Sequence, residues 1–194
     1  DAGVSTDGPV MLGTVTGRVQ MGTEGASLPD DLSVTLNIVD DQFNNQPIEI
    51  PAAADGSFEF SNVPIYTDRN YLVTTSLNGR VFGSQPVLWT DGQVSIELFV
   101  SVYEASSDPA IIEIAGMVSQ ISAVDNTLQV AQVYSIANNS DVVYSTDEVL
   151  DQNRFDGLRF PVPDGATVLS ASVDQFRYLL STDNTAVIDT ALVL

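Results

Sequence analysis

The sequence predicts an all-β protein built as two tandem Greek-key β-sandwiches. Apolar residues recur at every second position over most of the chain, which is the pattern of half-buried strands. Turn-forming residues separate these runs at short intervals. No window carries an apolar stripe with helical spacing over a helical length. Together these three observations favour packed sheets over any helical or mixed fold.

Residues 54–64 are the stretch on which this prediction rests most. Asp55-Gly56 supplies a tight turn, because glycine reaches positive φ without strain and aspartate bonds its nearby backbone. Phe58 and Phe60 then alternate with polar residues, so both rings point to one face of a short strand. Pro64 ends the pairing, since it has no N–H to donate. Such a strand needs a second layer to cover its aromatic face.

The first half, residues 13–103, holds about seven strands, the density of a Greek-key sandwich. The hairpin signal Asn78-Gly79 joins two of them. The expected strands are 13–21 (with Val15, Val19 and Met21 inward), 33–38 (Val34, Leu36, Ile38), a Pro-bounded edge strand at 47–51, 57–63, 71–77 (Tyr71, Val73, Thr75, Leu77), 81–82 and 92–102 (Val94, Ile96, Leu98, Val100, Val102).

A polar stretch ending in Pro109 predicts a linker at 104–110, followed by a second sandwich over 111–194. Its expected strands are 111–118, 127–136, 142–145, 158–162, 169–173, 176–180 and 186–194. The chain stops within the last of these, at Leu192-Val193-Leu194, so we expect an incomplete second sandwich with an unpaired apolar edge. The alternative is that the natural chain continues beyond residue 194.

The composition excludes several classes of function. There are 26 acidic against 6 basic residues, a formal net charge of -20, and every basic residue is arginine. No basic stripe can form, which argues against nucleic acid or an anionic membrane surface as a partner. No run of about 18 apolar residues predicts a membrane span. Without cysteine or histidine, disulfides, imidazole or thiolate catalysis and Cys/His zinc sites are impossible.

The N-terminal end points to an extracellular or cell-surface protein. The chain begins at Asp1 rather than methionine, which we interpret as the mature end left by signal-peptide cleavage, with a trimmed chain as the alternative. Residues 1–12 read as an N-terminal arm that ends in the apolar patch Val10-Met11-Leu12. That arm is expected either to lie on its own domain or to pair with a neighbouring subunit.

The first half resembles the carboxypeptidase regulatory-like (transthyretin-like, prealbumin-type) sandwich family. The matching residues are Gly13 to Val19, Leu32 to Leu36, Ala54 to Phe60 with Asn62-Val63-Pro64, and Tyr71-Leu72-Val73. The second half resembles an immunoglobulin-like sandwich through Asn138-Asn139-Ser140 and Phe160 to Ala166. The resemblance implies secreted or surface-attached modules of prokaryotes that stiffen, space or present other parts. It carries over no site residues.

No residue is assigned to catalysis, to a cofactor or to a metal. The carboxylate pairs Asp30-Asp31, Asp40-Asp41 and Asp147-Glu148 all lie in predicted loops, and nothing in the sequence selects two of them to face each other across a cleft. Calcium is the one candidate ion, with Asp40, Asp41, Asn44 and Asn45 as its first candidate ligands, although no EF-hand-type loop is present. A solvated acidic turn is the simpler interpretation of these four residues.

Three further features remain open. Trp89, the one tryptophan, either stacks on a sugar ring or packs in the core. Asn138 begins a glycosylation sequon in a predicted turn. Arg159 and Arg177 lie in predicted strands, where an ion pair with an acidic neighbour is the expected role.

The sequence therefore favours a non-enzymatic extracellular structural protein. We expect a self-associating subunit of a surface filament, sheath or layer, joined by addition of the N-terminal arm or the C-terminal strand to a neighbour's sheet. The alternatives are an adhesin or carbohydrate-binding module, with or without calcium, and a passive spacer. An exposed Trp89 would favour the binding module, and a buried one would count against it.

Overall fold

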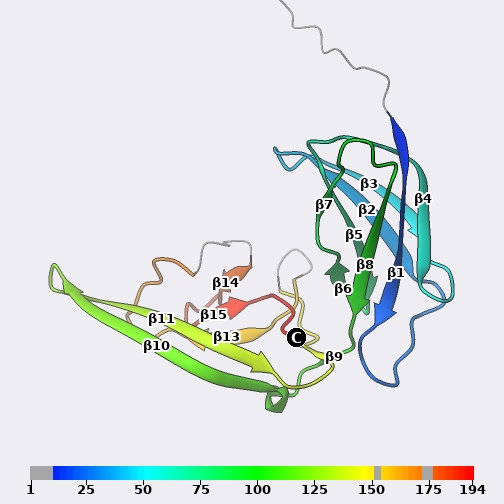
Figure 1. Ribbon diagram of the computed structural model, residues 1–194. Helices are drawn as coiled ribbons and strands as arrows, with labels where there is room; N and C mark the ends of the chain where they lie inside the picture. The colour runs from blue at the N-terminus through cyan, green and yellow to red at the C-terminus, as the bar shows by residue number, and fades with distance from the viewer. Residues whose placement is uncertain (1–10, 151–153, 172–176) are drawn as a thin grey trace, which may run out of the picture. The chain divides into compact units, whose positions relative to one another are not determined.

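The computed structural model describes residues 11–150, 154–171 and 177–194. The chain divides into two units, Asp1–Tyr103 and Glu104–Leu194 (Figure 1). All elements of the described residues are strands apart from one short 3-10 turn, so the prediction of an all-β fold is confirmed. The immunoglobulin-like and prealbumin-like assignments and the Greek-key order remain predictions.

Unit 1 consists of two sheets. One has the order β4-β1-β8 and the other β3-β2-β5-β6, with β7 paired to β5. Only β1 and β8 run parallel; the remaining pairs are antiparallel. The strands are β1 (Leu12–Met21), β2 (Ser33–Val39), β3 (Asn45–Pro51), β4 (Ser57–Pro64), β5 (Asn70–Leu77), β6 (Arg80–Gly83), β7 (Val87–Leu88) and β8 (Ser95–Val102).

The core of unit 1 is formed by the alternate residues that the sequence pattern indicated. Val15, Val34, Leu36, Tyr71 and Val100 are among its fully buried side chains. On β4, the Phe58 and Phe60 rings are both buried and lie in edge contact at 5.8 Å between centroids. The aromatic strand therefore has the covering layer that its sequence required.

Gly17 shows how closely the first sheet is packed. A Cβ built on Gly17 would lie 2.5 Å from Cζ of Phe58 and 1.8 Å from the carbonyl oxygen of Leu98. The Phe58 ring thus fills the space that a side chain at residue 17 of β1 would need. Glycine is required here by close approach, since its φ is not positive.

Two details of unit 1 bear on the prediction. Met11 and Leu12 of the expected arm lie on their own unit, one of the two arrangements expected for it, and β1 already begins at Leu12: Leu12 pairs with Pro64, and the Met11 carbonyl accepts a 2.8 Å hydrogen bond from the Ile65 N–H. The rest of the arm, residues 1–10, lies outside the described residues. Val94 precedes β8 and is exposed, because the inward alternation begins only at Ile96.

Unit 2 is made of shorter strands around a small core, with one long hairpin. Its sheets are β10-β11, the parallel pair β12-β9, and β13-β15-β14. Its elements are β9 (Ala105–Ser106), the 3-10 turn η1 (Pro109–Ile111), β10 (Ile112–Val124), β11 (Thr127–Asn138), β12 (Val143–Tyr144), β13 (Leu158–Pro161), β14 (Tyr178–Leu180) and β15 (Ala186–Asp189). Val143, Ala186 and Ile188 are its buried apolar residues in the described part.

The strand boundaries of unit 2 depart from the prediction in three places. Residues 105–106 of the expected linker form β9, which pairs with β12 within the unit. β10 continues beyond Val118 to Val124, through a stretch where no strand was expected. Residues 169–171 form no strand. Residues 172–176, which include the end of the strand expected at 169–173 and the start of the strand expected at 176–180, lie outside the described residues.

The expected unpaired C-terminal edge is wrong. β15 ends at Asp189 and lies between β13 and β14, so both of its edges are paired. Beyond it, Val193 forms an antiparallel bridge to Tyr144 of β12. Val193, near the end of the chain, is therefore held by a strand of its own unit.

Candidate functional site

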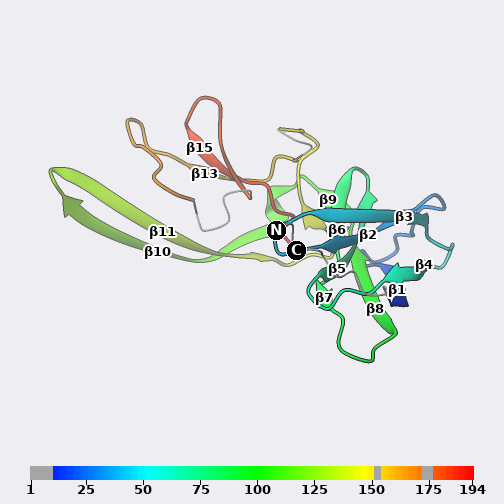
Figure 2. The same ribbon diagram turned by 90° about the horizontal axis from the view of Figure 1, so that it is seen from above.

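The β10–β11 hairpin is the first candidate surface for contact with another molecule. Its two strands pair from Ile112↔Asn138 to Val124↔Thr127. Neither strand has a second strand partner among the residues that the structure describes. In both views the tip of the hairpin extends beyond the β13–β15–β14 sheet of the same unit (Figures 1 and 2). The hairpin therefore presents two free edges.

A tight turn closes the hairpin at Asp125-Asn126. Both residues have positive φ, 49° and 64°, as a two-residue type I′ turn requires. Asn and Asp tolerate this region better than other residues with side chains. The turn matches the natural twist of the flanking strands, so β10 and β11 stay in register up to the tip.

Both faces of the outer part of the hairpin are exposed. Every residue from Met117 to Val133 is exposed, and we call this segment the ribbon. One face carries Met117, Ile121, Leu128 and Val130, and the other carries Val118, Val124 and Val133. Leu128 is 70% and Val118 68% exposed, so neither face is covered by the rest of unit 2 in the described residues.

The ribbon carries almost no charge. Asp125 in the turn is the only charged residue from Ile114 to Asn138, in a chain whose formal net charge is -20. From Ile114 to Asn138 the strands contain no proline, and no lysine or other charge protects their edges. Natural proteins normally protect exposed edges with such residues. A ribbon with large apolar side chains on both faces and a single charge, in its turn, is suited to pairing with another strand.

The base of the hairpin is fixed to its unit by aromatic and polar contacts. The Tyr134 ring on β11 meets the Phe160 ring on β13 at 4.9 Å between centroids. At the end of β11, Nδ2 of Asn138 donates to the carbonyl oxygens of Val142 and Val193, at 2.7 and 2.9 Å. Oδ1 of Asn138 accepts from the backbone N–H and the hydroxyl of Ser140. The hairpin thus projects from an anchored base.

These contacts also bear on the sequon at Asn138. A glycan would take the place of one Nδ2 hydrogen, and both hydrogens are already directed at backbone carbonyls. The side chain holds the C-terminal segment to the loop before β12, a structural role that disfavours glycosylation.

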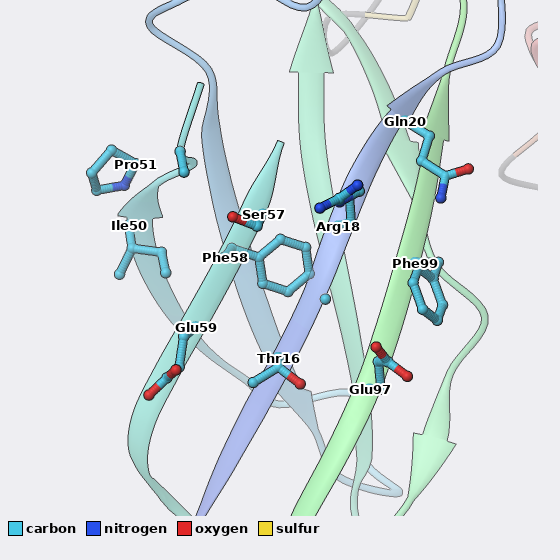
Figure 3. A pocket seen from close by; sticks show the side chains of 12 residues that line it. Thr16, Arg18, Gln20, Ile50, Pro51, Ser57, Phe58, Glu59, Glu97 and Phe99 are labelled. Carbon is cyan, nitrogen blue, oxygen red and sulfur yellow. The ribbon is translucent and has the colours of Figure 1, made fainter. Parts of the chain in front are cut away.

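A second candidate surface lies on the outer face of the β4-β1-β8 sheet. It is a hollow of about 680 Å³ beside the edge of β3 (Figure 3). Phe99 is its one exposed ring, at 53%, among polar side chains. The residues that line it include Thr16, Arg18, Gln20, Ile50, Pro51, Ser57, Phe58, Glu59, Glu97 and Phe99.

The charges of this hollow are partly satisfied within the unit. Arg18 donates to Asp55 at 2.9 Å, and Glu59 accepts from the hydroxyl of Ser61. The remaining chemistry is one aromatic face with amide, hydroxyl and carboxylate groups around it. Such a surface can hold a neutral polar molecule such as a sugar.

Trp89 is buried, at 2% exposure, and cannot serve as a sugar platform. Its ring contacts Tyr71 edge-on at 5.7 Å between centroids. The hydroxyl of Tyr71 in turn donates to the carbonyl of Pro64 and accepts from the N–H of Tyr66. Of the two roles that the sequence left open, the structure places Trp89 in the core.

The residues proposed as calcium ligands form a hydrogen-bonded turn. Oδ1 of Asp40 accepts from the N–H groups of Gln42 and Asn44, and Oδ2 accepts from Nδ2 of Asn44. These bonds, led by the Asn44 side chain, lower the pKa of Asp40. Asn45 instead donates to Asn37 across the β2–β3 pair. The described residues contain no cluster of three acidic side chains able to hold a metal ion.

The other acidic pairs do not form a site either. Asp30, Asp31 and Asp147 are exposed, and Glu148 lies 3.8 Å from Arg159. The expected ion pairs of the two arginines are present: Arg159 pairs with Asp156 at 2.9 Å, and Nε of Arg177 donates to Asp189 at 2.7 Å. The carboxylates of both pairs are buried. These pairs stabilise unit 2, and no carboxylate in them faces a cleft.

No protein-family model and no curated protein matches this chain. No helix of the described residues is long and apolar enough to cross a membrane. The function must therefore be argued from the geometry alone.

Proposed function

We propose that the chain is a non-enzymatic extracellular structural protein, a subunit whose copies associate by β-strand addition into a surface filament, sheath or layer. The observation that carries the proposal is the ribbon, which exposes large apolar side chains on both faces and has no strand partner on either edge within the described residues. We therefore propose this hairpin, rather than the two chain ends, as the associating segment.

The low stability expected of an isolated two-stranded sheet supports a partner for the ribbon. A two-stranded sheet with both faces in water is at best marginally stable, and three or more strands are needed for independent stability. A strand added to either edge would satisfy the outward backbone groups and cover apolar side chains. The ribbon therefore gains more from an added strand than any other surface of the described residues.

The charge of the chain supports a copy of itself as that partner. A basic partner would bind to the acidic surfaces, and the ribbon offers it no carboxylate except Asp125. Two copies of a chain with net charge -20 repel each other at low salt. Contact through the uncharged ribbons keeps the acidic surfaces apart. Self-association is thus expected to strengthen with salt, whereas a basic partner would be lost.

The test is sedimentation velocity over a range of protein and salt concentrations, with negative-stain microscopy of the concentrated sample. We expect oligomers that grow with sodium chloride. Val130→Lys, on the ribbon, should return the protein to a monomer. Val81→Lys adds the same charge at an exposed valine of unit 1 and should not. A wild-type chain that stays monomeric at high concentration and high salt would instead indicate a passive spacer.

The alternative function, a carbohydrate-binding module, is carried by Phe99 rather than Trp89. Its exposed ring lies beside Gln20 and Glu97 in the hollow of unit 1 (Figure 3). Retarded migration in gels that contain a polysaccharide, abolished by Phe99→Ala and kept in Val81→Ala, would support it. Unchanged migration in a panel of neutral and acidic polysaccharides would remove it.

A further inference from the structure

We propose that the contact between copies is an antiparallel pairing of β11 with β11 of a second copy, centred on Ala131. This inference rests on the proposed self-association and specifies its edge, its direction and its register. The paired hairpins would form one four-stranded sheet in the order β10-β11-β11-β10.

The choice of edge follows from the two strands. β10 contains an irregularity between Ile114 and Gly116, where its register against β11 shifts, and its second residue is the charged Glu113. Bulges and charges protect an edge from added strands. β11 has neither: it runs for 12 residues without a charge, a glycine or a proline. β11 is therefore the less protected edge of the hairpin.

The direction of the backbone groups follows from the turn. Residues that flank a two-residue turn form a hydrogen-bonded pair, and such pairs then alternate with non-hydrogen-bonded pairs along the ladder. Val124 and Thr127 flank the turn, so the N–H and C=O groups of Leu128, Val130, Gln132 and Tyr134 point away from β10. These four residues form the hydrogen-bonding edge of the outer part of β11, and Ile136 continues it toward the base.

The register follows from pairing all four residues with their copies. The register that pairs these four residues with the same four of the copy places Leu128 opposite Tyr134 and Val130 opposite Gln132, which puts the two-fold axis at Ala131. A shift by two residues toward the turn leaves Tyr134 unpaired, and a shift by two toward the base brings the half-buried Ile136 into the pairing. Because the pairing is isologous, both copies contribute the same residues.

The contact also suits the side chains. Leu128 would meet Tyr134 of the partner on one face, and Ala131 would face its own copy on the other face. No charged residue lies on the shared strand, so burying the edge leaves no unpaired charge. The sheet would still have β10 at each outer edge, free for the further contacts that a filament or layer needs.

Single-cysteine crosslinking tests this arrangement, because the chain has no cysteine of its own. In the proposed register, residue 131 of each copy lies directly opposite its counterpart, at about 4.5 Å between Cα atoms, within the range of a disulfide. Gln129 is exposed on the same face of β11, but its two copies would lie four residues apart along the strands, about 13 Å. Ala131→Cys and Gln129→Cys are therefore a matched pair.

Under mild oxidation, we expect Ala131→Cys to form a disulfide-linked dimer at least about tenfold faster than Gln129→Cys, because only residue 131 is held near its copy. Equal rates for the two variants would overturn the register. Absence of a dimer from Ala131→Cys, while the wild type associates in sedimentation, would overturn the β11 contact and leave the proposed function standing. A wild type that is monomeric in the same buffer would overturn both.

Discussion

Tyr134 of β11 and Phe160 of β13 pack ring against ring, with centroids 4.9 Å apart and planes inclined by 44°. The two residues lie in different sheets of unit 2, so this contact fixes the base of the hairpin to the β13–β15–β14 sheet. Tyr134 also lies at the end of the edge that we propose for strand addition. The same ring contact therefore stabilises unit 2 and holds the ribbon in place.

We expect Tyr134→Ala to loosen the hairpin while leaving unit 1 intact. An aromatic pair contributes about 0.5–1.5 kcal/mol beyond the area it buries. Hydrogen exchange at the inward-facing amides of Val118 and Val133 should become faster. Tyr134→Phe keeps the ring and loses only the 3.1 Å hydrogen bond to Gln132, so its exchange should stay close to wild type. Unchanged exchange in Tyr134→Ala would show that Phe160 does not anchor the hairpin.

Gly17→Ala should destabilise unit 1 by about 2–4 kcal/mol, as overpacking in a closely packed core does. The added Cβ would meet the Leu98 carbonyl and the Phe58 ring, and a backbone oxygen cannot turn away. Gly83→Ala is the matched control, because its Cβ would lie 3.6 Å from the nearest atom. Urea unfolding followed by Trp89 fluorescence reports on unit 1. Equal midpoints for the two variants would contradict the packing argument.

The sequence was sufficient for the parts of the fold that follow from local periodicity. The alternation in β2, β5 and β8 identified most of the core of unit 1, and burial of Phe58 and Phe60 followed from their spacing. The hairpin was found only in part. Its outer strand residues mix small polar side chains, such as those of Ser119 and Ser122, with apolar ones, so the two-residue alternation is weak there. Its turn, Asp125-Asn126, is also a weaker hairpin signal than Asn-Gly.

The candidate site was less predictable for a physical reason. Alternation shows that a strand has two kinds of face, but it does not show whether another layer covers the apolar one. Val118 and Val34 look alike in sequence, yet Val118 is exposed and Val34 is buried. The near absence of charge from Ile114 to Asn138 was the available signal for an unprotected edge. The pairing of Val193 with Tyr144 depends on tertiary contacts that no local pattern encodes.

Arg177→Met should destabilise unit 2 by about 2–3 kcal/mol, because it leaves the buried carboxylate of Asp189 without its cation. That side chain is only 4% exposed, while Arg177 is 41% exposed and partly screened, which places the effect below that of a fully buried pair. Arg18→Met breaks an ion pair whose partners are both exposed and should cost at most about 1 kcal/mol. The free energies come from denaturant unfolding of each variant. Similar losses for the two would contradict the role given to burial.

The stability of unit 2 should fall in acid partly through Asp183. Hydrogen bonds from the Ser181 hydroxyl, and then from the Thr185 hydroxyl and N–H, lower the pKa of Asp183 from 3.8 to about 2. A carboxyl group whose pKa is lower in the folded chain stabilises the fold above about pH 4, and this contribution is lost as the pH falls through about 2. We expect Asp183→Asn to be less stable than wild type at pH 5 and to approach it at pH 2.

The measurement is the urea midpoint of both proteins at pH 5 and pH 2, with the Asp183 carboxyl titrated by NMR in the wild type. Neutral asparagine can still accept the Thr185 bonds through its amide oxygen, so the variant should fold and lose only the charge-dependent part. Its midpoint should therefore change less with pH than that of the wild type. A difference between the two proteins that stays constant from pH 5 to pH 2 would show that the ionised carboxylate of Asp183 does not stabilise this turn.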